Sequence, residues 1–106
     1  MSEFAAAMHA GMERMMRDMH GAAQTGSPDR DFLAMMIPHH EGAVEMARLE
    51  LVHGRDPATR RLAEDIIASQ TTEIAAMKQR LALLGGAPGR ADQEFPALGG
   101  TRGEGR

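Results

Sequence analysis

Two adjacent histidines, His39 and His40, follow Pro38 in a stretch whose apolar residues recur at helical spacing. Imidazole nitrogen and thioether sulfur are neutral donors that suit soft ions such as Cu(I) and Ag(I), whereas Ca²⁺, Mg²⁺ and Mn²⁺ prefer oxygen. Donors of both kinds gather here, because three methionines flank the pair: Met35, Met36 and Met46. These residue types predict a soft-metal site around the histidine pair.

The same donors recur upstream, where residues 1–19 contain six of the ten methionines. A methionine at core spacing is most often packing material, and a lone histidine on an apolar face is most often a hydrogen-bonded core residue. Packing alone is better served by Leu, whose rotamers are better defined, so the clustering favours metal binding. Besides the residues around Pro38, the candidate ligands are His9, Met12, Met15, Met16, Met19, His20 and Met77.

Composition argues against several other functions. The 106 residues carry 12 basic and 15 acidic side chains, a formal net charge of -3, so nucleic acid and anionic membranes are poor partners. No run of about 20 apolar residues is present to span a membrane. Cysteine is absent, and a site of neutral donors suits an oxidising or mildly acidic compartment. The N-terminus has no intact signal peptide, so the chain is either cytoplasmic or a mature or trimmed form of an exported protein.

Three helices must position these donors. Ser2, Ser27 and Asp56 are N-cap candidates, and prolines follow the last two at the first helical position. We therefore expect helices over 3–22, 28–53 and 57–84, packed antiparallel as a bundle within a 3–85 domain. Residues 86–106 are rich in Gly and Pro and read as a tail, in which Phe95 and Leu98 are the apolar anchors. A fourth helix from the tail or from a second copy would complete the bundle, unless three helices suffice, and we favour a symmetric dimer.

The helical period assigns a direction to each candidate. His40 falls inside the apolar face of the second helix, whereas His39 lies about 100° away on its flank. Gly42 lies on the same flank, where the missing side chain lets another group approach. We expect Pro38 to kink the helix and turn both histidines toward a shared pocket. On the first helix one stripe contains Phe4, Met8, Met12, Met15 and Met19.

The run MIPHHEGAVEMA, Met36 to Ala47, resembles the signature of a bacterial family known as domain of unknown function 305. The Met-rich first helix and the segment from Leu62 to Leu81 are also similar to that family. The resemblance implies a helical domain of the ferritin-like superfamily, often exported, with relatives that bind copper or silver. Because many relatives carry a signal peptide, it also implies a trimmed exported domain, periplasmic or extracellular, with cytoplasmic residence as the alternative. By motif matching it carries over Met36, His39, His40, Met46 and Met77. Arg80 departs from the pattern, because relatives often have Trp there.

The sequence thus predicts a Cu(I)-binding protein, with Ag(I) as an alternative ion, that sequesters the metal or exchanges it with a partner protein. We expect no catalytic turnover, because no nucleophile with its base and no phosphate loop is present. The spacing from Glu50 to His53 is only half of a di-iron motif. The rival hypothesis is a protein-interaction module, in which methionines repack around apolar partners and histidines act as a pH switch.

Overall fold

The computed structural model describes residues 1–22 and 24–85, and within this part every regular element is an α-helix. Helix α1 spans Glu3–His20, α2 spans Pro28–His53 and α3 spans Pro57–Leu83. The all-α class is confirmed, and the expected helix bounds agree to within two residues. The predicted tail, 86–106, lies outside the described residues.

Each helix begins at the predicted cap. The Ser2 hydroxyl accepts a hydrogen bond from the Ala5 N–H at 3.1 Å, and the Ser27 hydroxyl accepts one from the Arg30 N–H at 3.4 Å. The Asp56 carboxylate accepts from both the backbone N–H and the hydroxyl of Thr59, at 2.9 and 2.6 Å. These bonds satisfy N–H groups that have no partner within the helix.

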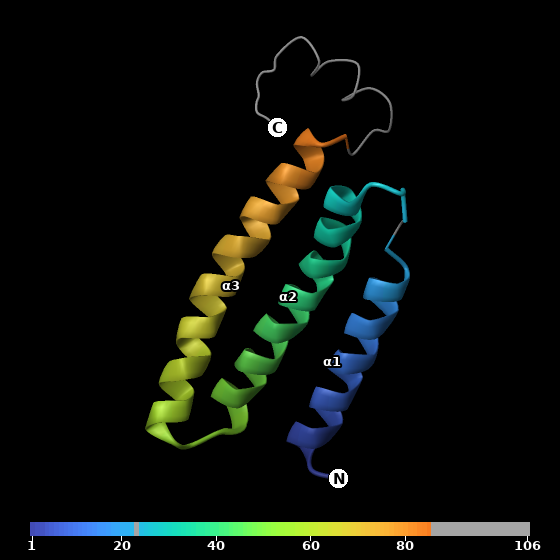
Figure 1. Cartoon of the computed structure of the whole chain (residues 1–106). Helices are drawn as coiled ribbons and strands as arrows, with labels where there is room; N and C mark the ends of the chain where they lie inside the picture. Colours follow the sequence, from blue (N-terminus) through green and yellow to red (C-terminus); the bar gives the residue numbers. More distant parts are fainter. Residues whose placement is uncertain (23, 86–106) are drawn as a thin grey trace.

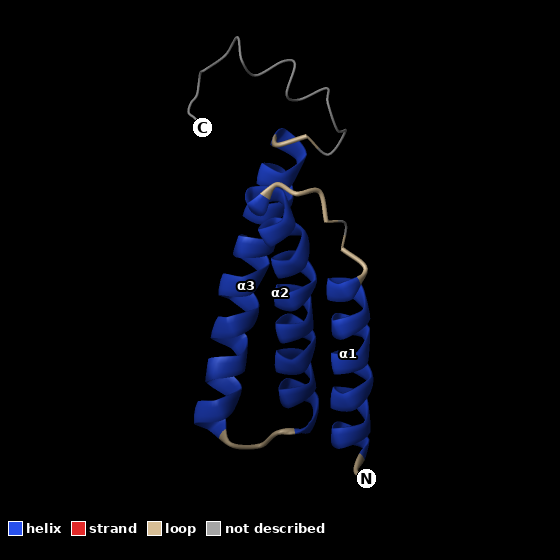
Figure 2. Cartoon of the chain, turned by 45° about the vertical axis from the view of Figure 1, so that its right-hand side comes forward, coloured by secondary structure: helices blue, strands red, loops and turns tan. Residues whose placement is uncertain are grey.

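Helix α2 lies between α1 and α3 and runs antiparallel to both. It packs against both α1 and α3, and Figures 1 and 2 show it between them in two views. At its C-terminal end, the Arg60 guanidinium donates to the carbonyl oxygens of Leu51 and Gly54, at 2.7 and 3.0 Å. This side chain joins the start of α3 to the end of α2, which fixes how the two helices are placed.

One side of this layer leaves part of α2 uncovered, and we call it the open face. A hollow of about 440 Å³ on this face is lined by all three helices: Phe4 and Met8 from α1, Ala43, Met46, Ala47 and Glu50 from α2, and Thr59, Leu62, Ala63 and Ile66 from α3. Residues 36, 39, 43, 46 and 50 follow one another at helical spacing. The open face of α2 therefore continues from the hollow to His39 and Met36.

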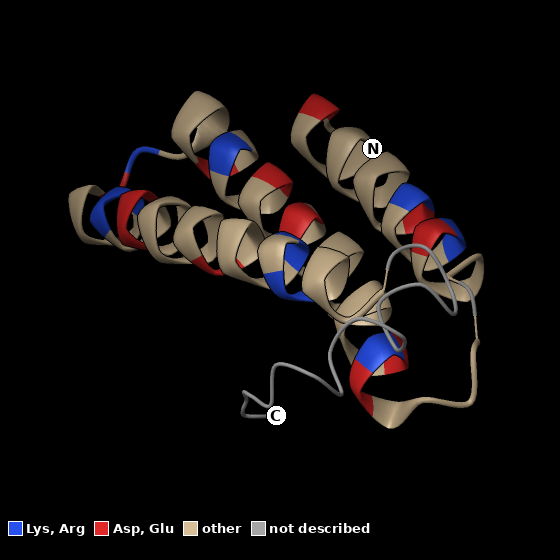
Figure 3. Ribbon diagram, turned by 90° about the horizontal axis from the view of Figure 1, so that it is seen from above, with Lys and Arg blue, Asp and Glu red and all other residues tan. Residues whose placement is uncertain are grey.

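The opposite side of the layer is charged. Glu45 pairs with Arg14 of α1, and Glu41 pairs with Lys78 of α3 at 3.2 Å. At 100° per residue, both glutamates lie about 140–180° around α2 from the middle of the open face. Figure 3 marks the charged positions of the three helices. The two ion pairs therefore link α2 to both neighbours away from the apolar hollow.

The described chain encloses only a small core. Its buried apolar residues are Ile37, Ala47 and Ala63, and no side chain in residues 1–22 and 24–85 has an exposed fraction below 2%. Large apolar side chains remain at the surface, among them Phe32 at 59%, Leu62 at 61% and Ile66 at 41% exposed. A single layer of three helices can bury each helix on fewer sides than a closed four-helix bundle does.

Candidate metal centre

His40 is the buried member of the histidine pair. It lies on the side of α2 that faces α3 and is 9% exposed. Its Nε2 is 2.6 Å from Oε1 of Glu73, which lies in the middle of α3. Its other ring nitrogen, Nδ1, is buried and has no hydrogen-bond partner. The ring is thus held from one side and has a free nitrogen on the other.

This arrangement suits a ligand more than a core residue. A carboxylate that accepts from Nε2–H leaves the lone pair of a neutral imidazole on Nδ1. Histidines that bind metal usually donate their second ring N–H to a carboxylate or carbonyl, which fixes the tautomer and the ring orientation. A buried polar atom without a partner costs free energy, so Nδ1 is placed where a bound ion or water would stabilise it.

Two methionines are near in sequence to the two residues of the His40–Glu73 contact. Met36 precedes His40 by four residues, and Met77 follows Glu73 by four, so each lies one turn away on the same side of its helix. Met77 also lines a hollow of about 430 Å³ with Leu33 of α2. Because α2 and α3 are antiparallel, both methionines lie toward the same end of the layer from the His40–Glu73 contact. We call Met36, His40, Glu73 and Met77 the inner cluster.

His39 has a different environment. It is exposed on the open face, and the centroid of its ring is 5.9 Å from that of His40, with a tilt of 57°. Helix α2 runs through Pro38 without a break, so one imidazole turns toward α3 and the other toward solvent. The two rings therefore differ in burial and in what they face, and the shared pocket stays a prediction. Within residues 1–22 and 24–85, no three His, Asp or Glu side chains gather as a metal site.

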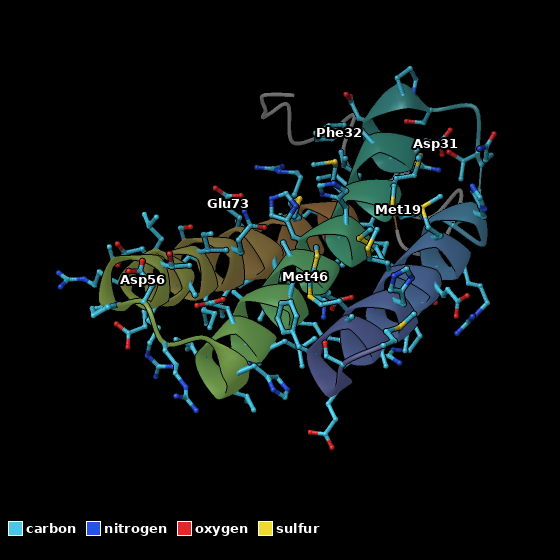
Figure 4. All side chains as sticks on the ribbon, turned by 90° about the horizontal axis from the view of Figure 1, so that it is seen from below. Met19, Asp31, Phe32, Met46, Asp56 and Glu73 are labelled. Carbon is cyan, nitrogen blue, oxygen red and sulfur yellow. The ribbon has the colours of Figure 1, made fainter. Side chains whose placement is uncertain are left out.

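A second set of thioethers lies between α1 and α2. Met15 rests on Gly42, where an added Cβ would lie 2.5 Å from its Sδ. This contact confirms that Gly42 admits a group from another helix. Figure 4 shows Met19 on α1 at the side facing α2, and Met46 on α2. Met8, Met15, Met19 and Met46 are all half-buried. The α1–α2 interface therefore has sulfur where a core usually has branched aliphatic side chains.

The remaining candidates on α1 lie at the surface. Met12 and Met16 are 47% and 46% exposed, although the sequence places Met12 in the same stripe as Met8 and Met15. They border a shallow hollow with His9, Glu13 and Arg17. His20 is exposed at the end of the helix, and Met35 is 36% exposed on α2. This outer group has the predicted donor types but does not join the inner cluster.

Two polar residues of α3 were not identified as site residues from the sequence. Glu73 contacts His40, and the Oε1 of Gln70 is buried without a hydrogen-bond partner. Both lie in the segment from Leu62 to Leu81 that is similar to the family, and Gln70 also falls within the apolar face of the third helix. Their spacing of three residues places them on one side of α3, but no local pattern indicates which residue of α2 they meet.

The carboxylate that orders the connection before α2 belongs to Asp31. It accepts hydrogen bonds from the Thr25 backbone N–H at 2.8 Å, the Thr25 hydroxyl at 3.0 Å and the Gly26 N–H at 3.3 Å. These bonds, the one from the Thr25 N–H first, lower the pKa of Asp31 below its ordinary 3.8. Gly26 needs its lack of a side chain here, because its φ is 86°. The carboxylate anchors the connection from α1 to α2, after which α2 runs back alongside α1.

Comparison with known proteins places most of the chain in one family. The family model described as "Domain of unknown function (DUF305)" matches residues 1–81, which include all three helices up to Leu81.

The chain belongs to the DUF305 family.

One curated protein with a similar segment is "Uncharacterized protein L153" of Acanthamoeba polyphaga mimivirus, which is 42% identical over 53 residues. The match covers 50% of this chain and 35% of that protein, so the chain spans much less than the full length of this relative. In the described part of the DUF305 chain, no helix has the length and hydropathy needed to cross a membrane.

Proposed function

We propose that this DUF305 protein binds a soft monovalent metal ion, Cu(I) or Ag(I), through imidazole and thioether ligands. The ion is the cargo of the protein, held for sequestration, tolerance or transfer, and no catalytic turnover is involved. The inner cluster would supply the primary site, with Nδ1 of His40 as the nitrogen donor and the sulfur atoms of Met36 and Met77 as the soft donors.

The observation that carries this proposal is the orientation of His40. Its Nε2 contacts Glu73, and its Nδ1 is buried without a partner. A histidine kept only for packing would gain stability from a second hydrogen bond, because an unsatisfied buried nitrogen costs roughly 1–3 kcal/mol. Met36 and Met77 each lie one turn along their helix from the His40–Glu73 contact, and thioether sulfur combined with imidazole nitrogen prefers Cu(I) to Mg²⁺ or Ca²⁺.

Other donors of the chain support capture and transfer. His39, Met35 and Met46 lie along the flank of α2, and Met15 and Met19 lie across from α2 on α1. The exposed group of His9, Met12, Met16 and His20 is accessible to an ion delivered by another protein. Since thioethers need no deprotonation and resist the oxidation to disulfides that consumes thiols, the donor set fits a periplasmic or extracellular location.

The test is a titration with Cu(I) under reducing, anaerobic conditions against a chromophoric competing chelator. The parent should withdraw Cu(I) from the chelator, and His40→Ala should bind it at least tenfold more weakly. Glu73→Ala, which keeps all proposed ligands, should lose roughly 10–100-fold in affinity, as is usual when the partner of a ligating histidine is removed.

The matched control is His53→Ala, which removes an exposed imidazole at the end of α2, where its ring contacts Phe4. This variant should bind as the parent does. Equal helix content of all variants by circular dichroism excludes unfolding as the cause. If the parent leaves Cu(I) on the chelator, or if His40→Ala and His53→Ala bind equally, the inner cluster is not a Cu(I) site. The interaction-module hypothesis then becomes the better one.

A further inference from the structure

The open face combines a hollow with an apolar ridge beside it. Leu62 and Ile66 of α3 line the hollow but keep 61% and 41% of their surface exposed. Phe4 and Met8 form the wall on the α1 side, and Met46 contributes to the floor on α2. One chain therefore presents both a recess and side chains of the size that would fill it.

We propose that a second copy of this chain covers the open face, with the Leu62–Ile66 ridge of each copy seated in the hollow of the other. In a two-fold interface the same patch must face itself, so residue i of one copy meets residue j of its partner and the reverse. A recess and a ridge on adjacent parts of one face satisfy this condition.

The charge distribution fits a copy of the same chain. Glu50 is the ionisable residue among those lining the hollow, whereas the ion pairs Arg14–Glu45 and Glu41–Lys78 lie toward the other side of the layer. A partner recognised by charge would need a charged complement on the open face. A nearly uncharged face can meet its own copy without bringing like charges together.

The size of the face also fits. Helix α1 has 18 residues, so it is about 27 Å long at 1.5 Å per residue, and neighbouring helix axes lie about 8–10 Å apart. The three axes thus define a flat patch of about 430–540 Å². Side chains make the surface of the three helices uneven, so its accessible area is larger than that of the flat patch. The area of the face is therefore near the roughly 800 Å² per partner that stable interfaces bury.

Dimerisation would also complete the core. In the described part of the chain no side chain is fully buried, and a domain this small has little apolar burial to lose. A partner copy would cover Leu62, Ile66, Phe4 and Met8 with its own copies of the same residues. One layer of three helices would then become two packed layers. This inference needs no metal ion, and the residues it uses lie outside the inner cluster, so either proposal can fail without the other.

The first experiment measures the mass of the metal-free, full-length chain by sedimentation velocity and light scattering across the micromolar range. The parent should approach twice the 11.4 kDa of one chain. Leu62→Glu and Ile66→Glu should weaken association at least tenfold, because each would place an unpaired carboxylate in an apolar interface. The matched control is Val52→Glu: Val52 is 73% exposed and lies about 160° around α2 from the middle of the open face. This variant should associate as the parent does.

A second experiment locates the interface. The parent contains no cysteine, so a single Ile66→Cys substitution can be cross-linked by a short bismaleimide only to another copy. Ile66→Cys should give a covalent dimer in high yield, whereas Val52→Cys should not. A parent of single-chain mass at every concentration overturns the proposal. So does a Leu62→Glu variant that associates as tightly as the parent, or cross-linking through Val52→Cys in preference to Ile66→Cys.

Discussion

At the scale of single residues, the contact between Glu73 and His40 determines what the histidine pair can do. The two residues lie 33 positions apart in the sequence and meet at 2.6 Å. Glu73 gives the two adjacent histidines different roles, because His40 gains a fixed ring and a free Nδ1 while His39 stays exposed. The pair is therefore better described as one buried candidate ligand and one surface donor than as a two-histidine clamp.

Replacing Glu73 should change the tautomer of His40 before any metal is added. In the parent, neutral His40 should carry its proton on Nε2, and Glu73→Ala should mix the two tautomers, as read from long-range ¹H–¹⁵N NMR spectra. The Glu73 side chain is 57% exposed, so the loss in unfolding free energy should be only about 1 kcal/mol. Glu64→Ala, an exposed carboxylate change on the same helix, should alter neither quantity. An unchanged His40 spectrum in Glu73→Ala would contradict this role.

Gly42 should be intolerant of a branched side chain. Its position admits the Met15 sulfur, which would lie 2.5 Å from an added Cβ. Gly42→Val should therefore lower the unfolding free energy by about 1–3 kcal/mol, because the Met15 side chain has to move away from α2. In a Met15→Ala background the same substitution should cost less, and urea unfolding of the four variants in this cycle measures the difference. Equal costs in both backgrounds would show that the two residues do not contact.

At the scale of the elements, caps and connections determine where each helix begins and how it joins the next, through contacts within a few residues. Ser2, Ser27 and Asp56 each occupy the N-cap that the sequence predicts. Two carboxylates support the elements: Asp31 holds the loop before α2, and Asp56 caps α3. The hydrogen bonds from Thr59, its hydroxyl first and its backbone N–H second, lower the pKa of Asp56 below its ordinary 3.8.

These two carboxylates make stability depend on acid. A pKa that is lower in the folded state than in the unfolded state stabilises the fold above the unfolded value and ceases to do so as the pH falls through the folded value. The contribution of Asp31 and Asp56 should thus be complete above pH 3.8 and be lost progressively below it.

The double variant Asp31→Asn, Asp56→Asn tests this, because Asn keeps the acceptor and the cap preference but does not titrate. Urea midpoints measured against pH should differ between parent and variant near neutrality, and the gap should narrow below pH 3.8. A gap that stays constant down to the lowest pH would show that neither carboxylate contributes through its charge.

At the scale of the whole molecule, the two outer helices differ in length and in how firmly they are held against α2. Helix α3, with 27 residues, is tied to α2 by Arg60, Glu73 and Lys78. Helix α1 has 18 residues and contacts α2 through the Arg14–Glu45 pair, the ring contact between Phe4 and His53, and the packing of Met15 on Gly42. Fewer cross-links and a flexible thioether interface should let α1 separate from the layer more readily than α3 does.

Native-state hydrogen exchange should show this difference. In Leu62→Glu, which we expect to be the single-chain form, amides in α1 should exchange through openings of lower free energy than amides in α2 and α3. Addition of Cu(I) should slow exchange in α2 and α3 if the inner cluster binds the ion, and in α1 as well if Met15 or Met19 takes part. Uniform protection of all three helices before metal is added would contradict the expected weakness of α1.

The sequence by itself determined the helices and their ends, because capping, proline placement and the 3.6-residue period act within a few residues. It also identified the family, because the run from Met36 to Ala47 and the third helix can be recognised from the sequence alone. It also singled out Gly42, because a residue without a side chain lets a neighbouring helix approach closely, whichever residue of that helix makes the contact. The donor types, and hence the kind of ion proposed, also follow from composition and spacing.

Only the tertiary structure decided which donors are buried and what they contact. The Met stripe of α1 is too broad to fix the rotation of that helix, and packing against α2 places Met15 inward and Met12 at the surface. The pairing of His40 with Glu73 depends on the register of two antiparallel helices, which no local pattern encodes. The open face likewise depends on the arrangement in which α2 lies between its neighbours. Periodicity gives each helix its faces, but the partner of each face is chosen by the packing of the whole chain.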